Sequence, residues 1–412
     1  NYGSPTSVIK WVCGAEYSLN SAPHFNPVRH VIGTSMNTTP DVIELTRHLV
    51  AMDTINPPGN EHQCCEYLAG LLDASGFVVQ LLEFSTGRSN LVARLGGQDE
   101  DLPICLTGHV DTVPLGAEAW SCDPFGGEIN ENKIYGRGTT DMKGGVAAMV
   151  VAAIRLAQEL PDTPGVVLVL TGGEETGCDG AKALCETPEI LGRAGAVVVG
   201  EPTSNEALIG HKGALWLNAV SQGITAHGST PELGVNAVYE ACRAVAKIED
   251  FGFNTPPHEI IGAPSINVGR IQGGINVNSV PDHAEFDIDI RTIPSQDHHE
   301  IRTHLEAYLG DKVTLAASVD VNGVISDASD PWIGEVFDVV EPILGSRPEI
   351  STAKYFTDAS VLSPQYGNPP TIILGPGDAS MAHKIDEYCE IDKLHQAVDI
   401  YEAIIKRWCR LD

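Results

Sequence analysis

The sequence has few basic residues and no long apolar stretch. Only 25 lysines and arginines stand against 55 aspartates and glutamates in 412 residues, a formal net charge of −30. So acidic a chain repels phosphate backbones and anionic lipid headgroups, which argues against nucleic acid or a membrane as partner. Apolar runs such as Val166–Leu170 are far shorter than the roughly 20 residues of a membrane-spanning helix.

The ten cysteines include no Cys-x-x-Cys pair. A chain of this length buries enough core to fold without disulfides, so the pattern favours reduced thiols in a cytoplasm over a disulfide framework or a zinc ribbon. The first 35 residues show no apolar segment with a cleavage-like end, and Met36 is a plausible native start. We therefore expect residues 1–36 to be a leader or extension outside the fold.

Alternating strand and helix patterns dominate the next part of the chain. Apolar strands are predicted to end near Thr107, Thr171 and Val199, with amphipathic helices between or before them. This alternation predicts an α/β fold with a mostly parallel sheet that is covered on both faces.

The hydrophobic pattern of the sequence changes near residue 214. His283–Ile290 alternates strictly between apolar and acidic residues, which is typical of an antiparallel strand with one solvated face. We expect an inserted α+β domain at 214–318. The main domain is then split into a first part at 37–213 and a second part at 319–412.

Charged residues follow the ends of the predicted strands. His109 and Asp111 close the first of them, Glu174 and Glu175 follow the next, and Glu201 follows the third. Parallel sheets bind ligands at the carboxyl ends of their strands. These residues are therefore candidates for one site.

Asp141 lies in a glycine-rich loop directly before an apolar run with helical spacing. Taken alone, an aspartate in this position is typical of a helix N-cap. Together with His109, His383 and the strand-end carboxylates, it instead suggests a cluster of metal ligands. Such a donor set suits Zn²⁺, with Mn²⁺ or Co²⁺ as alternatives, and one carboxylate can bridge two ions while another moves a proton.

Several motifs occur in a characteristic order: His109–Asp111, Gly138–Gly145, Gly173–Gly177, Gly200–Thr203 and Gly375–His383. In this order they resemble the acetylornithine deacetylase / succinyl-diaminopimelate desuccinylase / glutamate carboxypeptidase family of co-catalytic zinc hydrolases. The resemblance runs from about residue 40 to the C-terminus.

The resemblance implies a role for each matching residue. Asp141 would bridge two divalent ions, most simply Zn²⁺, and its peptide bond to Met142 would be cis. His109 and Glu201 would complete one metal site, and Glu175 and His383 the other. Asp111 would orient the His109 ring. Glu174 would act first as general base and then as general acid.

The resemblance implies that the main domain is the catalytic domain and that the inserted domain is a lid or dimerisation domain, which carries further matches. The segment around His227 resembles a motif whose histidine reaches the active site of a neighbouring subunit, which implies a homodimer through the lid domain. Asn278 and Arg291 match segments that contact a substrate carboxylate. Each also has a plainer interpretation: a surface or dimer-packing histidine, a turn former and a strand-end salt bridge.

The favoured function is a di-zinc amidohydrolase that removes an acyl group from an N-acyl amino acid and resembles acetylornithine deacetylase. A metallo-carboxypeptidase or dipeptidase with the same machinery is the first alternative, and a catalytically silent binding protein is a remote one. Either enzyme would act on a small molecule or short peptide. The histidines at 298 and 299 are expected to be solvated.

Overall fold

The structure is a computed structural model, and it describes residues 39–97 and 101–411. The predicted leader at 1–36 lies outside these residues. The described residues form ten α-helices. Their bounds are α1 Val42–Val50, α2 His62–Ala74, α3 Gly144–Leu156, α4 Asp179–Cys185, α5 Pro188–Leu191, α6 Ala237–Ile248, α7 His298–Leu309, α8 Pro331–Leu344, α9 Ala359–Gln365 and α10 Ile391–Cys409.

The larger sheet has the strand order β1-β2-β6-β3-β7-β16. Its strands are β1 Val78–Ser85, β2 Arg88–Leu95, β3 Ile104–His109, β6 Val166–Thr171, β7 Ala196–Val199 and β16 Thr371–Ile373. β6, β3, β7 and β16 are parallel, whereas β1 and β2 form an antiparallel edge. The predicted mostly parallel sheet is confirmed.

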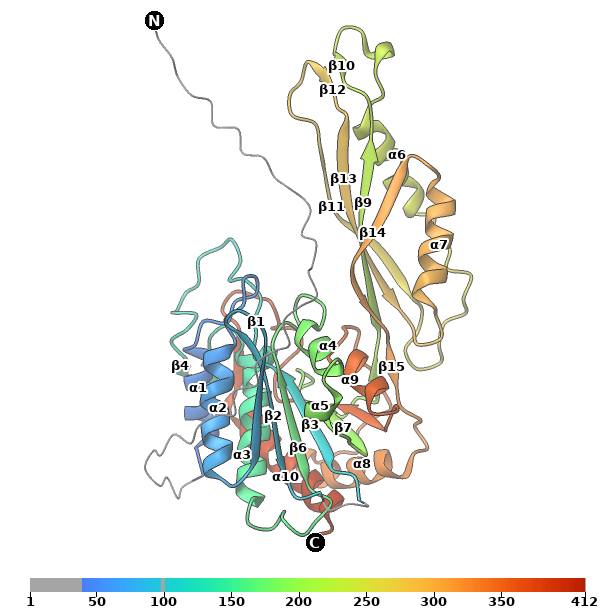
Figure 1. The fold of residues 1–412 in the computed structure, drawn as a ribbon. Coiled ribbons are helices and arrows are strands. Elements are labelled where there is room, and N and C mark those ends of the chain that lie inside the picture. Colours follow the sequence, from blue (N-terminus) through green and yellow to red (C-terminus); the bar gives the residue numbers. More distant parts are fainter. Residues whose placement is uncertain (1–38, 98–100, 412) are drawn as a thin grey trace, which may run out of the picture. The chain divides into compact units, whose positions relative to one another are not determined.

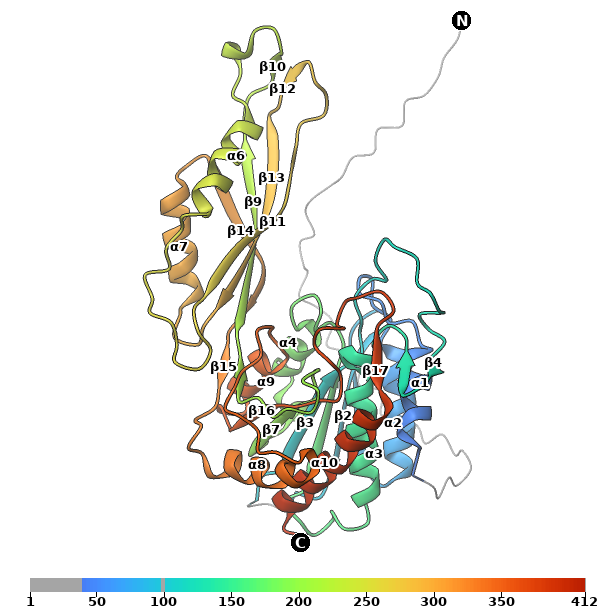
Figure 2. The same ribbon diagram turned by 180° about the vertical axis from the view of Figure 1, so that it is seen from behind.

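The strands of this sheet are buried on both faces because their side chains alternate between two cores. On β6, Leu168 and Leu170 pack into a core with α1, α2, α3, α8 and α10, whereas Val167 and Val169 pack into a core with α4, α5 and α9. Figures 1 and 2 show the two faces in turn. Such continuous apolar strands expose only their ends, so polar function is confined to the sheet edge.

A separate antiparallel sheet has the order β11-β13-β9-β14. Its strands are β9 Gly213–Gln222, β11 Ser265–Gly273, β13 His283–Thr292 and β14 Val313–Val321. Apolar side chains such as Phe286 and Ile288 pack against α6 and α7, and the intervening side chains face the other way. The predicted α+β part of the chain is present; the exact domain bounds stay a prediction.

Short strands complete the fold. β5 Lys133–Tyr135 pairs with β4 Glu128–Asn130 on one side and with β17 Tyr388–Glu390 on the other, and β8 Gly210–His211 pairs with β15 Val324–Ile325. The last pair is β10 Ala226–His227 with β12 Ser279–Val280.

The expectation that residue 298 is solvated is wrong. His298 begins α7 and is 6% exposed, with Nδ1 at 2.6 Å from Asp320 and Nε2 at 2.8 Å from the Thr292 hydroxyl. The start of α7 packs against β13 and β14, and periodicity alone did not reveal this contact.

Candidate metal centre

Residues at or just after the ends of three neighbouring strands lie together at one edge of the larger sheet. His109 is the last residue of β3, Glu174 and Glu175 follow β6, and Glu201 follows β7. Since β6, β3 and β7 are adjacent and parallel, these ends meet. The structure thus brings together the strand-end residues that the sequence singled out.

Asp141 reaches the same place from the turn before α3. Its peptide bond to Met142 is cis, as the resemblance implied. The N-cap position of α3 is taken by Lys143, so Asp141 does not cap this helix. The alternative interpretation of Asp141 as a helix cap is therefore wrong.

The two oxygens of the Asp141 carboxylate face different histidines. Oδ1 is 3.1 Å from His109 Nε2, and Oδ2 is 3.4 Å from His383 Nε2. His383 Nε2 also lies 3.2 Å from Glu175 Oε2, and His109 Nε2 lies 3.6 Å from Glu201 Oε1. Each histidine thus has a glutamate of its own and shares one aspartate with the other.

His383 occupies the loop between β16 and β17. Its side chain is 54% exposed, whereas His109 is buried. Its backbone φ is 63°, a left-handed conformation that residues other than glycine adopt uncommonly. The centre therefore has a buried side at His109 and an open side at His383.

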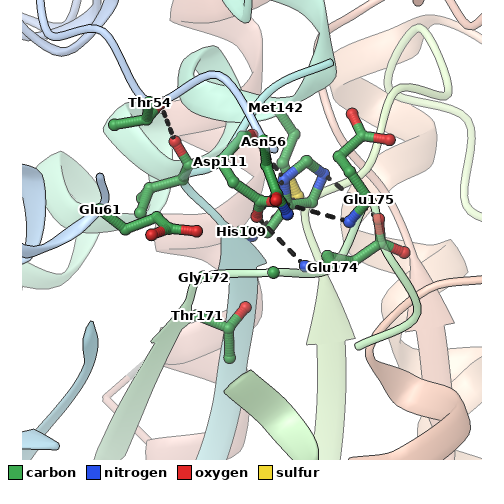
Figure 3. A network of polar contacts seen from close by, with 12 residues as sticks. Thr54, Asn56, Glu61, His109, Asp111, Met142, Thr171, Gly172, Glu174 and Glu175 are labelled. Atoms are coloured by element: carbon green, nitrogen blue, oxygen red, sulfur yellow. Dashed lines mark hydrogen bonds and ion pairs between the residues drawn. The ribbon is translucent and has the colours of Figure 1, made fainter. Parts of the chain in front are cut away.

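Asp111 holds the buried side of the centre in place, as Figure 3 shows. The Nδ1 atom of His109 lies 2.9 Å from the backbone oxygen of Asp111. The Asp111 carboxylate accepts hydrogen bonds from the backbone N–H groups of Glu174 and Glu175 and, at 2.9 Å, from the side-chain amide of Asn56. This leaves Nε2 of His109 as the atom that faces Asp141 and Glu201.

Glycines permit the close packing behind Glu201. A Cβ atom on Gly145, in the first turn of α3, would lie 2.2 Å from the backbone oxygen of Gly200, and one on Gly375 would lie 2.1 Å from the same oxygen. Both contacts are too short for any side chain. The helix that follows Asp141 can therefore lie directly against the strand end that carries Glu201.

Crowded acidic groups perturb one another's titration. Burial raises the pKa of Glu174 well above its usual value; His109 opposes this, and Glu201 adds to it. Burial likewise raises the pKa of Glu201. Burial alone would lower the pKa of His109, but Glu201 and the hydrogen-bonding aspartates hold it well above its usual value. Such large pKa shifts are typical of catalytic and metal sites.

The residues fit metal ions. Ligand atoms of His109, Asp141 and Glu175 lie within 4.8 Å of one another, and so do those of His109, Glu174 and Glu201. Oε1 of Glu175 is buried without a hydrogen-bond partner. A buried carboxylate oxygen without a partner is costly unless a cation or a water satisfies it.

Three neighbours of the centre were not assigned a role from the sequence. Asn56 belongs to a Pro-Pro-Gly segment that reads as a helix breaker. Tyr355 donates its hydroxyl to the backbone oxygen of Pro202 at 2.7 Å. Asp358 accepts a hydrogen bond from the Thr171 hydroxyl, and burial raises its pKa to about 6. The sequence signal for Asp358 is a resemblance: the Thr-Asp-Ala segment at 357–359 is similar to a turn that flanks the active site in the family named above.

The predicted site residues of the inserted domain lie apart from this cluster. His227 is exposed in β10, and its ring bonds the hydroxyl and backbone N–H of Ser229. Asn278 is beside it, because its backbone oxygen accepts the N–H of Gly228 at 2.7 Å. Arg291 forms a salt bridge with Asp289 at 2.9 Å, with its guanidinium near the Trp216 ring. Among the described residues, no hydrogen bond or ion pair links the three to the centre.

A parallel-sheet edge that gathers two histidines and several carboxylates is the arrangement of a metal-dependent hydrolase. Comparison with known proteins agrees, because residues 105–407 match the model of Peptidase family M20/M25/M40. The chain belongs to this family. It is accordingly a metallohydrolase that acts on amide or peptide bonds, and the resemblance found in the sequence is confirmed.

Curated relatives align over nearly their whole length. The chain is 31% identical over 400 residues to a probable succinyl-diaminopimelate desuccinylase of Staphylococcus epidermidis, covering 89% of this chain and 98% of the relative. It is 30% identical over 390 residues to an acetylornithine deacetylase of Vibrio atlanticus, covering 90% and 99%.

A solved structure shares the fold. An M20 family metallo-carboxypeptidase from Sulfolobus solfataricus matches with a TM-score of 0.77 at 17% identity, covering 90% of this chain and all of that one.

Among the described residues, no helix has the length and apolar character to cross a membrane.

Proposed function

We propose that the protein is a two-metal deacylase that hydrolyses the amide bond of an N-acyl amino acid, in the manner of acetylornithine deacetylase. The observation that carries this proposal is the division of the Asp141 carboxylate between His109 and His383, each of which is paired with its own glutamate.

In this proposal Asp141 is shared by two ions. His109 and Glu201 complete one site, and Glu175 and His383 complete the other. The nitrogen and oxygen donors suit Zn²⁺, with Co²⁺ or Mn²⁺ as replacements. Distance alone would also admit Glu174 as a ligand. We assign Glu174 to proton transfer instead, in keeping with the role that the sequence resemblance implies for it.

Glu174 carries the proton. Bound metal ions would polarise the acyl carbonyl and lower the pKa of an attacking water. Glu174 takes a proton from that water and then delivers it to the leaving nitrogen of the amino acid. Burial raises the pKa of Glu174, which makes its carboxylate a stronger base towards the water.

Residues of the inserted domain would bind the substrate and complete the site across a homodimer. His227 lies in β10 and Asn278 directly precedes β12, so the two are neighbours where these short strands pair, and the nearby Ile275 and Val277 side chains are almost fully exposed. An exposed apolar pair is suited to a subunit contact. Arg291 would receive the substrate carboxylate in place of Asp289, since its planar guanidinium pairs with two oxygens.

We also propose that the enzyme works in the cytoplasm. All nine cysteines among the described residues are free thiols. Free thiols persist where the surroundings are reducing.

Replacing the proposed base tests the mechanism. Glu174→Gln should lower kcat at least 100-fold, because general catalysis by a positioned carboxylate contributes about 10²–10⁴-fold. Metal content should stay at the wild-type value. The assay should compare N-acetyl and N-succinyl amino acids, acyl-glutamates and dipeptides as test substrates. Faster hydrolysis of dipeptides would favour a dipeptidase instead, and a fully active variant would refute the role of Glu174.

A further inference from the structure

Glu387 is a buried glutamate outside the ligand set, four residues after His383. Its side chain is 0% exposed. Its Oε1 atom accepts hydrogen bonds from three backbone N–H groups of the loop that carries Asp141: Gly138 at 3.1 Å, Thr140 at 2.9 Å and Asp141 at 3.1 Å. This oxygen therefore fixes the backbone that ends at the shared aspartate.

The other oxygen of Glu387 pairs with a buried arginine. Oε2 accepts a hydrogen bond from Nη1 of Arg137 at 2.6 Å. Arg137 also donates to the backbone oxygens of Lys384 at 3.2 Å and Pro114 at 3.0 Å. The ion pair thus connects the Asp141 loop, the segment after His383 and the segment that follows Asp111.

Backbone contacts support the same junction. The Thr140 hydroxyl donates to the backbone oxygen of Tyr388 at 2.6 Å, and the N–H of Gly136 donates to the backbone oxygen of Glu387 at 2.9 Å. Two loops about 250 residues apart in sequence are therefore joined directly behind Asp141 and His383.

Stability does not explain why two charges are buried here. Removing a carboxylate and a guanidinium from water is costly, and apolar groups of similar size often stabilise a protein as well or better. Glu387 is also no additional metal ligand in this arrangement, because N–H groups already occupy both of its oxygens. What the pair provides is geometry, since charge-assisted hydrogen bonds hold donor and acceptor at short, defined distances.

We propose that Glu387, braced by Arg137, is a positioning residue that sets the spacing between Asp141 and His383, and with it the affinity of the metal site on the exposed side of the centre. The inference rests on the proposed two-metal function. His383 depends on this brace more than His109 does, because His109 sits in β3 and is oriented by Asp111, whereas His383 lies half-exposed in a loop.

Metal titration of Glu387 variants tests this directly. Glu387→Gln keeps an oxygen for the three N–H groups but presents its amide nitrogen to Arg137, and Glu387→Ala removes every acceptor. We expect one of the two metals to bind about 10–100-fold more weakly, as is usual when a group that orients a ligand is lost, with the larger effect in the alanine variant. Chelator competition and Co²⁺ absorption spectra would resolve the two sites without an activity assay.

A core variant far from the centre provides the control. Leu305→Ala in α7 removes a side chain that is 0% exposed in the core between the antiparallel sheet and α6 and α7, so it should lower Tm and leave both metal affinities unchanged. Glu387→Gln is the deciding variant if Glu387→Ala does not fold. If wild type binds two metals and Glu387→Gln binds both with wild-type affinity, the inference is wrong although the proposed function stands. If wild type binds no metal pair, the proposed function itself fails.

Discussion

The carboxylate of Asp111 accepts the backbone N–H of Glu174 at 3.2 Å, although the two residues are 63 positions apart. The same carboxylate accepts the N–H of Glu175 at 3.3 Å, and the Asp111 backbone oxygen faces Nδ1 of His109. One residue therefore fixes the ring of a proposed metal ligand and also the strand end that carries the proposed base. Orientation of His109 and placement of Glu174 are coupled through Asp111.

Loss of the Asp111 carboxylate should impair both metal binding and turnover. Asp111→Ala leaves two buried N–H groups without an acceptor, and we expect a loss of about 10–100-fold in metal affinity or kcat/KM. Asp111→Asn keeps one acceptor oxygen and should lose less. Metal competition and steady-state kinetics measure the two effects.

Asp330→Ala is a matched control for this comparison. Asp330 caps α8 through a hydrogen bond from the Trp332 N–H at 2.8 Å, so its loss should cost about 1 kcal/mol of unfolding free energy and no activity. Equal catalytic losses in the Asp111 and Asp330 variants would mean that Asp111 acts only on stability.

Asn56 stabilises the charged form of Asp111. We therefore expect an unusual order of activity among Asn56 variants. Its amide donates to Asp111 Oδ2 at 2.9 Å and to the Thr176 hydroxyl at 3.0 Å. Asn56→Ala removes these donors, whereas Asn56→Asp, although isosteric, places a second carboxylate against Asp111. We expect kcat/KM to fall further in the aspartate variant than in the alanine variant. The reverse order would show that side-chain volume, rather than the hydrogen bond, matters at this position.

Removal of metal should make stability depend on pH. Hydrogen bonds with Asp141 and Glu175 raise the pKa of His383 to about 10, and burial raises the pKa of Glu174. A group whose pKa is raised on folding stabilises the protein below its unfolded pKa, and this contribution is lost as the pH rises through the folded pKa. Asp141, whose pKa is lowered, has the opposite effect, but only as the pH falls below its usual value of about 4.

We therefore expect the Tm of chelator-treated protein to fall as the pH rises from about 6 to about 9. Added Zn²⁺ should raise Tm more at the upper end of this range, because the ions bind deprotonated ligands and relieve repulsion among the carboxylates. Thermal melts with and without metal measure both trends. A pH-independent Tm of the metal-free protein would contradict the assigned shifts.

The sequence predicts the buried half of the centre better than its surroundings. His109, Glu174 and Glu201 follow apolar runs, and parallel strand ends necessarily meet at one sheet edge. The antiparallel edge formed by β1 and β2 was not predicted, because an apolar strand reads alike in either direction. The pairing of Arg137 with Glu387 was also missed, since neither residue has a local signal and their contact depends on two loops that only the fold brings together.

His227 provides the sharpest test of the proposed dimer. It is exposed and, in the described part of the chain, shares no hydrogen bond or ion pair with Glu174 or the ligand cluster. If it completes the partner's site, His227→Ala and Glu174→Gln should each be inactive as pure dimers. Co-expressed with different tags, however, the two variants form hybrids in which one site has an intact Glu174 and receives an intact His227 from the other subunit.

Purified hybrids should therefore regain part of the wild-type activity, because one site is intact and the other lacks both groups. A histidine acting within its own subunit would leave every site of the hybrid defective, and no activity would return.

Replacing Val277 by Asp offers an independent check of the dimer. A charge on this almost fully exposed side chain should weaken the subunit contact, so activity per chain should fall on dilution while metal content stays unchanged. Light scattering at the same concentrations would show whether the loss of activity follows dissociation.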